Sequence, residues 1–398
     1  MNIVKQTLRA AALSAALTGV ATAQDVPLQE EKEIVIACRL PPEATWKSLP
    51  LLQRFKVKPT DQDYSYRLWL PRGYLADAEK RWPVLFIASP GGDARMGQMR
   101  DWIVRNGFIA VMLVESRNGP WGAVIGNFLA AHDDVVRRCR VQEGMKWATG
   151  FSGGARGASL FVQLRPGFSG LILQGAGGAQ YPEGPQQAQY IFEDIRAAPW
   201  IAVAITMGNS DMNASETAKV LADFRSGQAE AFRFDGGHAW APKAVFEPAA
   251  DWVMKRVLQD GPPNPALKPV YLLQFRERAQ AAQATTDPWT RYKHFGELQE
   301  FAKTRGLAAE PEARDLLARM NAEAPRWRGD PAVARQLQAA EALARLEQGG
   351  ARMPPALRRE QFKSFLTQYG GTDAAARAQQ LLDALPENSP GPAPRPRR

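Results

Sequence analysis

The sequence is poor in the side chains that usually bind transition metals, with two cysteines and three histidines among 398 residues. Neither Cys38 nor Cys139 belongs to a Cys or His pair with the spacing of a zinc site. The histidines are also far apart along the chain. The sequence therefore predicts no metal site and no cofactor.

The low, even number of cysteines leaves two states of these thiols open. In an oxidising compartment Cys38 and Cys139 can form one disulfide bond. Such a bond closes a loop of about 100 residues, worth up to about 4.7 kcal/mol in the chain-entropy model. Two buried, unpaired thiols are the equal alternative.

Long apolar runs are absent beyond the amino-terminal segment. Residues 1–23 contain Lys5 and Arg9, then a run of Ala, Leu and Val, and end in Ala21-Thr22-Ala23, a pattern typical of an export signal. The apolar run is too short to cross a bilayer of about 30 Å. We expect a signal peptide over residues 1–23, no transmembrane segment, and a periplasmic or secreted mature protein.

The chain also lacks a dense cluster of basic residues. Residues 261–398 contribute +6 of the net charge of +9, and acidic and basic residues alternate there along predicted helices. That alternation is typical of a solvated face, whereas nucleic-acid binding needs clustered Lys and Arg beside stacking aromatics. We expect no nucleic-acid partner.

Short β-branched or aromatic runs alternate with Ala-rich amphipathic stretches between Tyr64 and Gln259. This alternation predicts an α/β domain, with a mostly parallel sheet flanked by helices on both faces. The expected strands are 66–70, 83–88, 109–114, 146–151, 170–174, 201–206 and 229–234. The expected helices are 94–106, 127–140, 153–164, 185–197, 214–226 and 242–258.

A breaker cluster from Asp260 to Pro265 ends this pattern. The chain is therefore divided into an α/β domain over 24–260, a linker over 261–267, a small all-helical domain over 268–387 and a disordered basic tail over 388–398. The expected helices of the small domain are 271–282, 288–304, 311–324, 331–348, 355–369 and 373–385.

One segment of the small domain, Phe362–Leu382, weakly resembles a single tetratricopeptide helix pair. No second copy follows at a 34-residue period, so the sequence does not predict a repeat array. The helices are a candidate surface for a protein partner.

The motif Gly150-Phe151-Ser152-Gly153-Gly154 has the pattern Gly-x-Ser-x-Gly. A strand-like run precedes it, and a stretch rich in Gly and Ala follows. A nucleophile elbow needs this arrangement, because the strand and the helix approach too closely for larger side chains. Ser152 is therefore the predicted nucleophile, and a Gly-rich loop with an ordinary serine is the alternative.

A serine needs a base to become nucleophilic near neutral pH, and only three histidines are available. His132 falls in a predicted helix before Ser152 and is interpreted as a surface residue. His294 belongs to the helical region. His238 follows the last predicted strand in a Gly-rich loop, at the edge of the sheet where the elbow emerges. His238 is the predicted base.

The acid is expected in the loop after the penultimate strand, where Asp211 ends a polar turn. Asp is also a favoured helix N-cap, so Asp211 can instead begin the helix that follows. Asp235 is a rival acid three residues before His238, but its loop would have to fold back on itself.

The chain order Ser152, Asp211, His238 resembles that of the α/β-hydrolases, over about half of the chain. Within that fold the sequence is similar to the secreted esterases grouped with polyhydroxybutyrate depolymerases and feruloyl or acetyl-xylan esterases, at residues 66–71, 150–154 and 237–240. The resemblance implies ester hydrolysis through an acyl-enzyme. Ser152 attacks, His238 transfers the proton, and Asp211 orients the imidazole.

One loop departs from this family. Its members usually carry His-Gly after the third strand, whereas residues 88–93 here read Ala-Ser-Pro-Gly-Gly-Asp. Pro90 has no N–H, so the expected oxyanion-hole donors are the N–H groups of Gly91 or Gly92, together with that of Gly153.

Four aromatic side chains fall in loops expected at the same edge and are candidate pocket residues: Trp121, Phe151, Tyr181 and Trp240. Ordinary packing explains each of them equally well. The expected substrate is a small-molecule or polysaccharide-linked ester.

Two other interpretations stay open. A peptidase or amidase uses the same triad on the same fold. A hydrolase-like scaffold without catalysis, which binds a partner through its helical region, is suggested by the unusual Ser89-Pro90.

Overall fold

The computed structural model describes residues 26–184, 186–350 and 353–385. The expected signal peptide (1–23) and basic tail (388–398) lie outside the described residues. The chain divides into two compact units, with the boundary between Val257 and Leu258. None of the described helices combines the length and apolar character that a membrane span requires.

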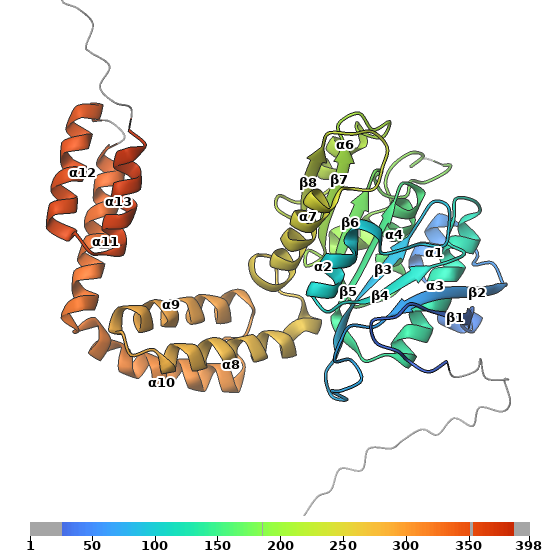
Figure 1. Cartoon of the computed structure of the whole chain (residues 1–398), viewed down its shortest axis with the longest axis horizontal. Coiled ribbons are helices and arrows are strands. Elements are labelled where there is room, and N and C mark those ends of the chain that lie inside the picture. Colours follow the sequence, from blue (N-terminus) through green and yellow to red (C-terminus); the bar gives the residue numbers. More distant parts are fainter. Residues whose placement is uncertain (1–25, 185, 351–352, 386–398) are drawn as a thin grey trace, which may run out of the picture. The chain divides into compact units, whose positions relative to one another are not determined.

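Eight strands of the amino-terminal unit form one sheet in the order β1-β2-β4-β3-β5-β6-β7-β8 (Figure 1). β2 is antiparallel to β1 and β4, and all other neighbours are parallel. The loops that follow the parallel strands therefore gather at one edge of the sheet. The strands are β1 (Ile34–Arg39), β2 (Asp63–Trp69), β3 (Trp82–Ala88), β4 (Ile109–Leu113), β5 (Val141–Phe151), β6 (Phe168–Gln174), β7 (Ala202–Gly208) and β8 (Ala229–Phe234).

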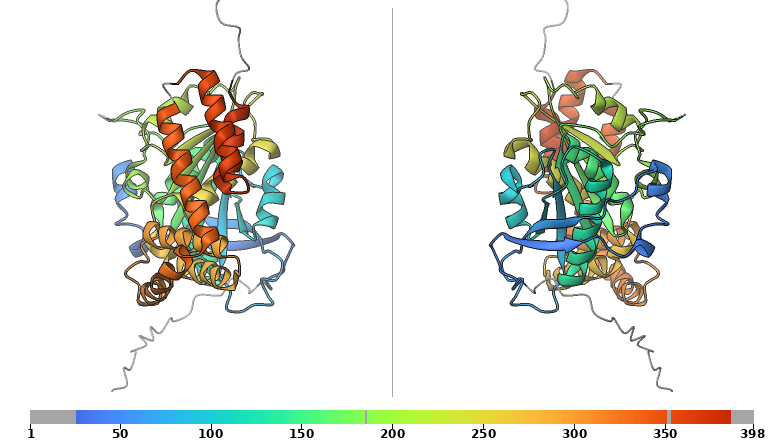
Figure 2. Two further views of the ribbon diagram at one scale, coloured as in Figure 1. Left: turned by 90° about the vertical axis from the view of Figure 1, so that its left-hand side faces the viewer. Right: turned by 90° about the vertical axis from the view of Figure 1, so that its right-hand side faces the viewer.

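Helices cover both faces of this sheet (Figure 2). On one face α3 (Trp121–Arg138) packs on α4 (Gly153–Leu164), where the rings of Phe128 and Phe161 stack with centroids 4.4 Å apart. On the other face α2 (Arg100–Arg105) and α7 (Lys243–Lys255) meet around Trp102. Its ring also stacks on Trp147 of β5. Burying each such aromatic ring contributes roughly 1.5–3 kcal/mol.

The sequence misses two short elements, β1 and α1 (Pro50–Phe55). β1 alternates buried and exposed residues because it is an edge strand with one covered face. The expected helix over 185–197 is wrong for most of its length, since only α5 (Glu193–Ala197) is helical there. The expected helix over 214–226 shortens to α6 (Glu216–Ala222).

The expectation that His132 is a surface residue is wrong. Its side chain is buried, its ring stacks on Phe86, and its Nδ1 lies 2.8 Å from Oδ1 of Asp133. Its Nε2 lies 3.5 Å from Nζ of the buried Lys146. Burial lowers the pKa of His132 to about 4, so the imidazole is neutral near pH 7.

The two cysteines are both buried and are not bridged to each other. Cys38 belongs to β1, and Cys139 follows α3. This arrangement corresponds to the alternative of two unpaired thiols.

The described part of the carboxyl-terminal unit is helical. A short 3-10 turn over Pro265–Leu267 precedes its first long helix and is capped by Asn264, whose Oδ1 accepts the N–H of Ala266 at 3.0 Å. Phe362, Phe365 and Leu382 belong to a small core of this unit. The helices are α8 (Lys268–Ala284), α9 (Pro288–Thr304), α10 (Pro311–Arg328), α11 (Pro331–Gly350), α12 (Pro355–Tyr369) and α13 (Asp373–Asp383).

Candidate active site

Ser152 lies in a tight turn between β5 and α4, with φ 53° and ψ −119°. A side chain at this positive φ is strained, and such strain is held only by closely packed surroundings. The packing is visible at the flanking glycines. A β-carbon at Gly154 would overlap the Ala88 carbonyl oxygen, and one at Gly150 would lie 2.8 Å from the same atom. The motif therefore folds as a nucleophile elbow against the end of β3.

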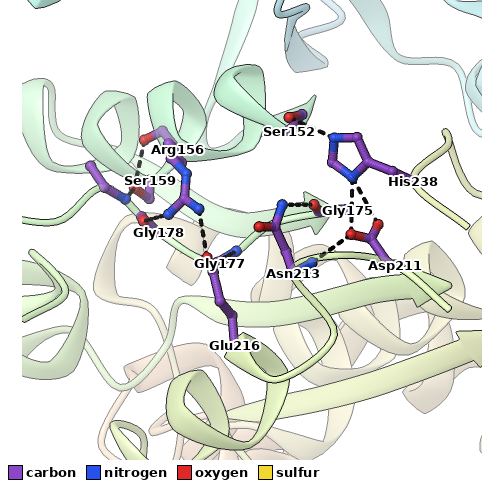
Figure 3. A network of polar contacts seen from close by, with 11 residues as sticks. Ser152, Arg156, Ser159, Gly175, Gly177, Gly178, Asp211, Asn213, Glu216 and His238 are labelled. Carbon is purple, nitrogen blue, oxygen red and sulfur yellow. Dashed lines mark hydrogen bonds and ion pairs between the residues drawn. The ribbon is translucent and has the colours of Figure 1, made fainter. Parts of the chain in front are cut away.

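Three side chains from separate loops meet above this turn (Figure 3). Nε2 of His238 lies 2.9 Å from Oγ of Ser152. On the other side of the ring, Nδ1 lies 3.0 Å from both carboxylate oxygens of Asp211. The structure thus brings Ser152, His238 and Asp211 within hydrogen-bonding distance, in the order that a serine nucleophile, its base and an orienting acid require.

The Asp211 carboxylate is fully shielded from solvent. Besides His238, it accepts the backbone N–H of Asn213 at 2.8 Å, and the amide of Asn213 donates to the Gly175 carbonyl at 2.8 Å. Asp211 does not cap the helix that follows, because the N-cap of α6 is Ser215. The rival Asp235 accepts instead from the Asn209 amide at 2.7 Å.

The loop that carries Asp211 is bonded to the loop that carries His238. The N–H of Asn209 donates to the Phe234 carbonyl at 2.8 Å, and that of Ser210 donates to the Gly236 carbonyl at 2.9 Å. The close approach needs a glycine at the end of β7, since a β-carbon at Gly208 would lie 2.5 Å from the Gly236 carbonyl oxygen. The positions of Asp211 and His238 are therefore coupled through the backbone.

A cavity of about 340 Å³ opens beside Ser152 and His238. Sequence reasoning misses most of its walls, which come from the loop after β4 and the start of α4 and from the turn before α6. The position of that first loop at the carboxyl edge of the sheet is the one signal that points to it. The lining residues are Ser116, Arg117, Asn118, Gly119, Trp121, Val124, Ser152, Gly153, Arg156, Met212, Asn213 and His238.

The four candidate aromatic residues are divided among different places. Trp121 lines the cavity. Phe151 packs between two other rings. Its centroid lies 4.7 Å from that of His238 and 5.4 Å from that of Trp240. Tyr181 lines a neighbouring cavity and donates from its hydroxyl to Glu193 at 2.9 Å. Burial and this carboxylate raise the pKa of Tyr181.

An ion pair supports the wall of the cavity. Arg156 of α4 pairs with Glu216 of α6 at 2.6 Å and donates to the Gly178 carbonyl at 3.0 Å. Glu216 also accepts the N–H of Gly177 at 2.7 Å (Figure 3). These contacts fix the position of α4 relative to the loop after β6. The charge of the Arg156 guanidinium is therefore balanced by the Glu216 carboxylate.

The expected oxyanion-hole donors are not all at the cavity. Gly153 lines it at the amino terminus of α4, where backbone N–H groups favour negative charge. The N–H of Gly92 closes a turn by donating to the Ser89 carbonyl at 3.0 Å. Gly91 lines a different cavity, of about 550 Å³. Within the described residues, no group of three His, Cys, Asp or Glu side chains is placed to hold a metal ion.

No protein-family model matches the chain, and no match to it was found among curated proteins. Several solved structures are similar to about half of it. A ferulic acid esterase has 16% sequence identity and a TM-score of 0.40, over 56% of this chain and 98% of its own. The S-formylglutathione hydrolase FrmB from Staphylococcus aureus has 11% identity and a TM-score of 0.39, over 57% and 99%. A puromycin-hydrolyzing peptidase from Mycobacterium tuberculosis has 14% identity and a TM-score of 0.38, over 51% and 38%.

The fold itself follows from the strand order. β2 is antiparallel to its two neighbours, and β3 lies between β4 and β5, which carries the elbow at its carboxyl end. With helices on both faces of this sheet, the amino-terminal unit has the α/β-hydrolase fold.

Proposed function

We propose that this protein is a serine hydrolase that cleaves carboxylic esters through an acyl-enzyme on Ser152. One observation carries the proposal, namely the continuous line of contacts from Oγ of Ser152 through both ring nitrogens of His238 to the buried Asp211 carboxylate. A serine hydroxyl with no positioned base is a weak nucleophile, and this line supplies the base and its orienting acid.

In the first half of the reaction, Nε2 of His238 takes the hydroxyl proton while Oγ of Ser152 bonds to the ester carbonyl carbon. The π electrons of the carbonyl move to its oxygen and form an oxyanion. That anion collapses, the bond to the alcohol oxygen breaks, and the imidazolium gives its proton to the leaving alcohol. Asp211 stabilises the imidazolium without itself taking the proton.

In the second half, water attacks the acyl-enzyme. His238 takes one proton from the water as the new C–O bond forms, and the second oxyanion collapses with loss of Oγ of Ser152, which takes the proton back from Nε2. A carboxylic acid leaves and the enzyme is restored. No step consumes a cofactor.

An ester is the substrate class that we favour over a peptide. The residues around the nucleophile and the base, 150–154 and 237–240, resemble those of secreted esterases. The cavity of about 340 Å³ beside Ser152 suits a small acyl or alcohol group next to Trp121. We also propose that the protein acts outside the cytoplasm after removal of residues 1–23.

The test combines active-site labelling with a substrate panel. A fluorophosphonate probe is expected to label the wild type on Ser152 and to leave Ser152→Ala unlabelled, with Ser169→Ala, a buried serine of β6, as the matched control that still reacts. Hydrolysis is then measured on p-nitrophenyl esters of increasing acyl length and on matched peptide anilides. Cleavage of the anilides alone would replace the esterase proposal by a peptidase, and an unlabelled wild type would refute catalysis by Ser152.

A further inference from the structure

The tetrahedral intermediate of this reaction carries an oxyanion that needs at least two hydrogen-bond donors for efficient stabilisation. The N–H of Gly153, next to the nucleophile, is one donor at the cavity. The loop after β3 commonly supplies the second donor in this fold. In this chain Pro90 has no N–H, the N–H of Gly92 is donated to the Ser89 carbonyl, and Gly91 lines an adjoining cavity that shares Asn118 with the first. Neither Pro90 nor Gly92 can therefore supply that second donor.

A side-chain amide lies beside the elbow in the same cavity. Asn118 lines the same cavity as Ser152, Gly153 and His238. Its carboxamide is packed directly on the backbone of Gly153. A β-carbon at Gly153 would overlap Oδ1 of Asn118, and would lie 2.8 Å from its Cγ and 3.3 Å from its Nδ2. A side chain at position 153 would therefore displace this amide.

The backbone of Asn118 is held in place by the loop that follows β3. The N–H of Asn118 donates to the Pro90 carbonyl at 2.8 Å, and Arg117 forms a β-bridge with Gly91. The segment from β4 to α3 is thus tied to the segment after β3. This bonding places Asn118 beside the elbow.

The amide of Asn118 is also unengaged. Among the residues that the structure describes, its side chain has no hydrogen-bond partner. A carboxamide offers two N–H donors on one end, and rotation by 180° about its last side-chain bond exchanges the oxygen and nitrogen positions. Nδ2 can therefore face the carbonyl oxygen of a bound ester without any backbone movement.

We propose that the carboxamide of Asn118 is the second donor of the oxyanion hole, acting together with the N–H of Gly153. This inference rests on the proposed acyl transfer at Ser152. As the carbonyl carbon becomes tetrahedral, negative charge grows on its oxygen, and Nδ2 of Asn118 donates a hydrogen bond that is stronger in the transition state than in the bound ester. The side chain thus replaces the backbone N–H that the Ser89-Pro90 sequence removes.

The decisive variants are Asn118→Ala, which removes the amide, and Asn118→Asp, which keeps its shape but turns the donor into an anion. Removing one oxyanion donor lowers kcat about 10²–10³-fold. We expect that fall in Asn118→Ala, with KM changed by less than about threefold, and at least the same fall in Asn118→Asp. Asn321→Ala, an exposed Asn in α10, is the matched control and is expected to keep wild-type kcat.

A second readout separates this role from a structural one. A trifluoromethyl ketone, which forms a tetrahedral oxyanion adduct with the serine, is expected to lose about as much affinity in Asn118→Ala as kcat loses. The thermal midpoint of each variant should stay within a few degrees of the wild type, because Asn118 is exposed.

The outcomes distinguish the two proposals. Wild-type kcat in Asn118→Ala, in a protein whose Ser152→Ala variant is inactive, would overturn only the role of Asn118. A rise in KM with unchanged kcat would also overturn it, since it indicates ground-state binding. A wild type without activity on any ester or anilide would overturn both proposals.

Discussion

Both carboxylate oxygens of Asp211 lie 3.0 Å from Nδ1 of His238, although 27 residues separate the two side chains. Asp235, only three residues from His238 in sequence, bonds to Asn209 instead. The acid is therefore selected by the adjacency of β7 and β8 in the sheet, and not by closeness along the chain. This choice gives the imidazole a buried partner in place of an exposed one.

Asp211→Asn is expected to lower kcat about 10⁴-fold with the fold intact, because the amide favours the wrong tautomer of His238 and does not stabilise the imidazolium. Initial rates on a short-chain p-nitrophenyl ester measure this change. Asp235→Asn is the matched control and should stay within about twofold of the wild type. The reverse ranking of the two variants would make Asp235 the acid.

Ser152→Gly is expected to be more stable than Ser152→Ala by about 0.5–2 kcal/mol. At φ 53° a side chain costs about 1–3 kcal/mol, which glycine avoids, while the greater freedom of glycine in the unfolded chain offsets part of the gain. Denaturant unfolding of the two inactive variants measures the difference. Equal stability of the two variants would show that the strain at position 152 does not exceed the entropic cost of glycine.

The stability of the amino-terminal unit should fall as the pH drops from about 6.5 to 4, in part because of His132. Burial lowers its pKa in the folded protein to about 4, while the unfolded chain binds the proton near pH 6.5. Below pH 6.5 the unfolded state therefore takes up a proton that the folded state does not, and acid favours unfolding. The expected contribution is about 3 kcal/mol over this range.

The measurement is denaturant unfolding at pH 7 and at pH 4.5 in the wild type and in His132→Gln. In His132→Gln the difference in unfolding free energy between pH 7 and pH 4.5 is expected to be smaller than in the wild type by about 2–3 kcal/mol. His294→Gln, in α9 of the other unit, serves as the control. An unchanged pH dependence in His132→Gln would show that other groups carry it.

The thiols of Cys38 and Cys139 should be inert in the folded protein. Burial raises the pKa of both, that of Cys139 to about 11, so little thiolate is present near pH 7. A thiol reagent is expected to modify neither in native buffer and both in denaturant without reductant. Absence of reaction in denaturant, with reaction restored by a reductant, would indicate a disulfide.

The sequence predicts the parts of this site that depend on local pattern. The run before Ser152 and the small residues after it are a local signature, and β8 and α4 begin and end where the pattern indicates. The surface assignment of His132 fails because its environment is supplied by distant residues, including Lys146 and Phe86.

The same reason explains why no sequence motif points to Asn118. It belongs to no motif. It reaches the elbow because β4, β3 and β5 are parallel neighbours, so the loops that follow them lie at the same edge of the sheet. The donors expected from Gly91 and Gly92 rest on the family pattern of one loop. The strand order places the loop after β4 at the same edge of the sheet, and the family motif does not include that loop.

The backbone bonds of Asn209 and Ser210 to the loop of His238 couple the position of Asp211 to that of His238. A change of length in either loop is therefore expected to displace both side chains of the pair and not one alone.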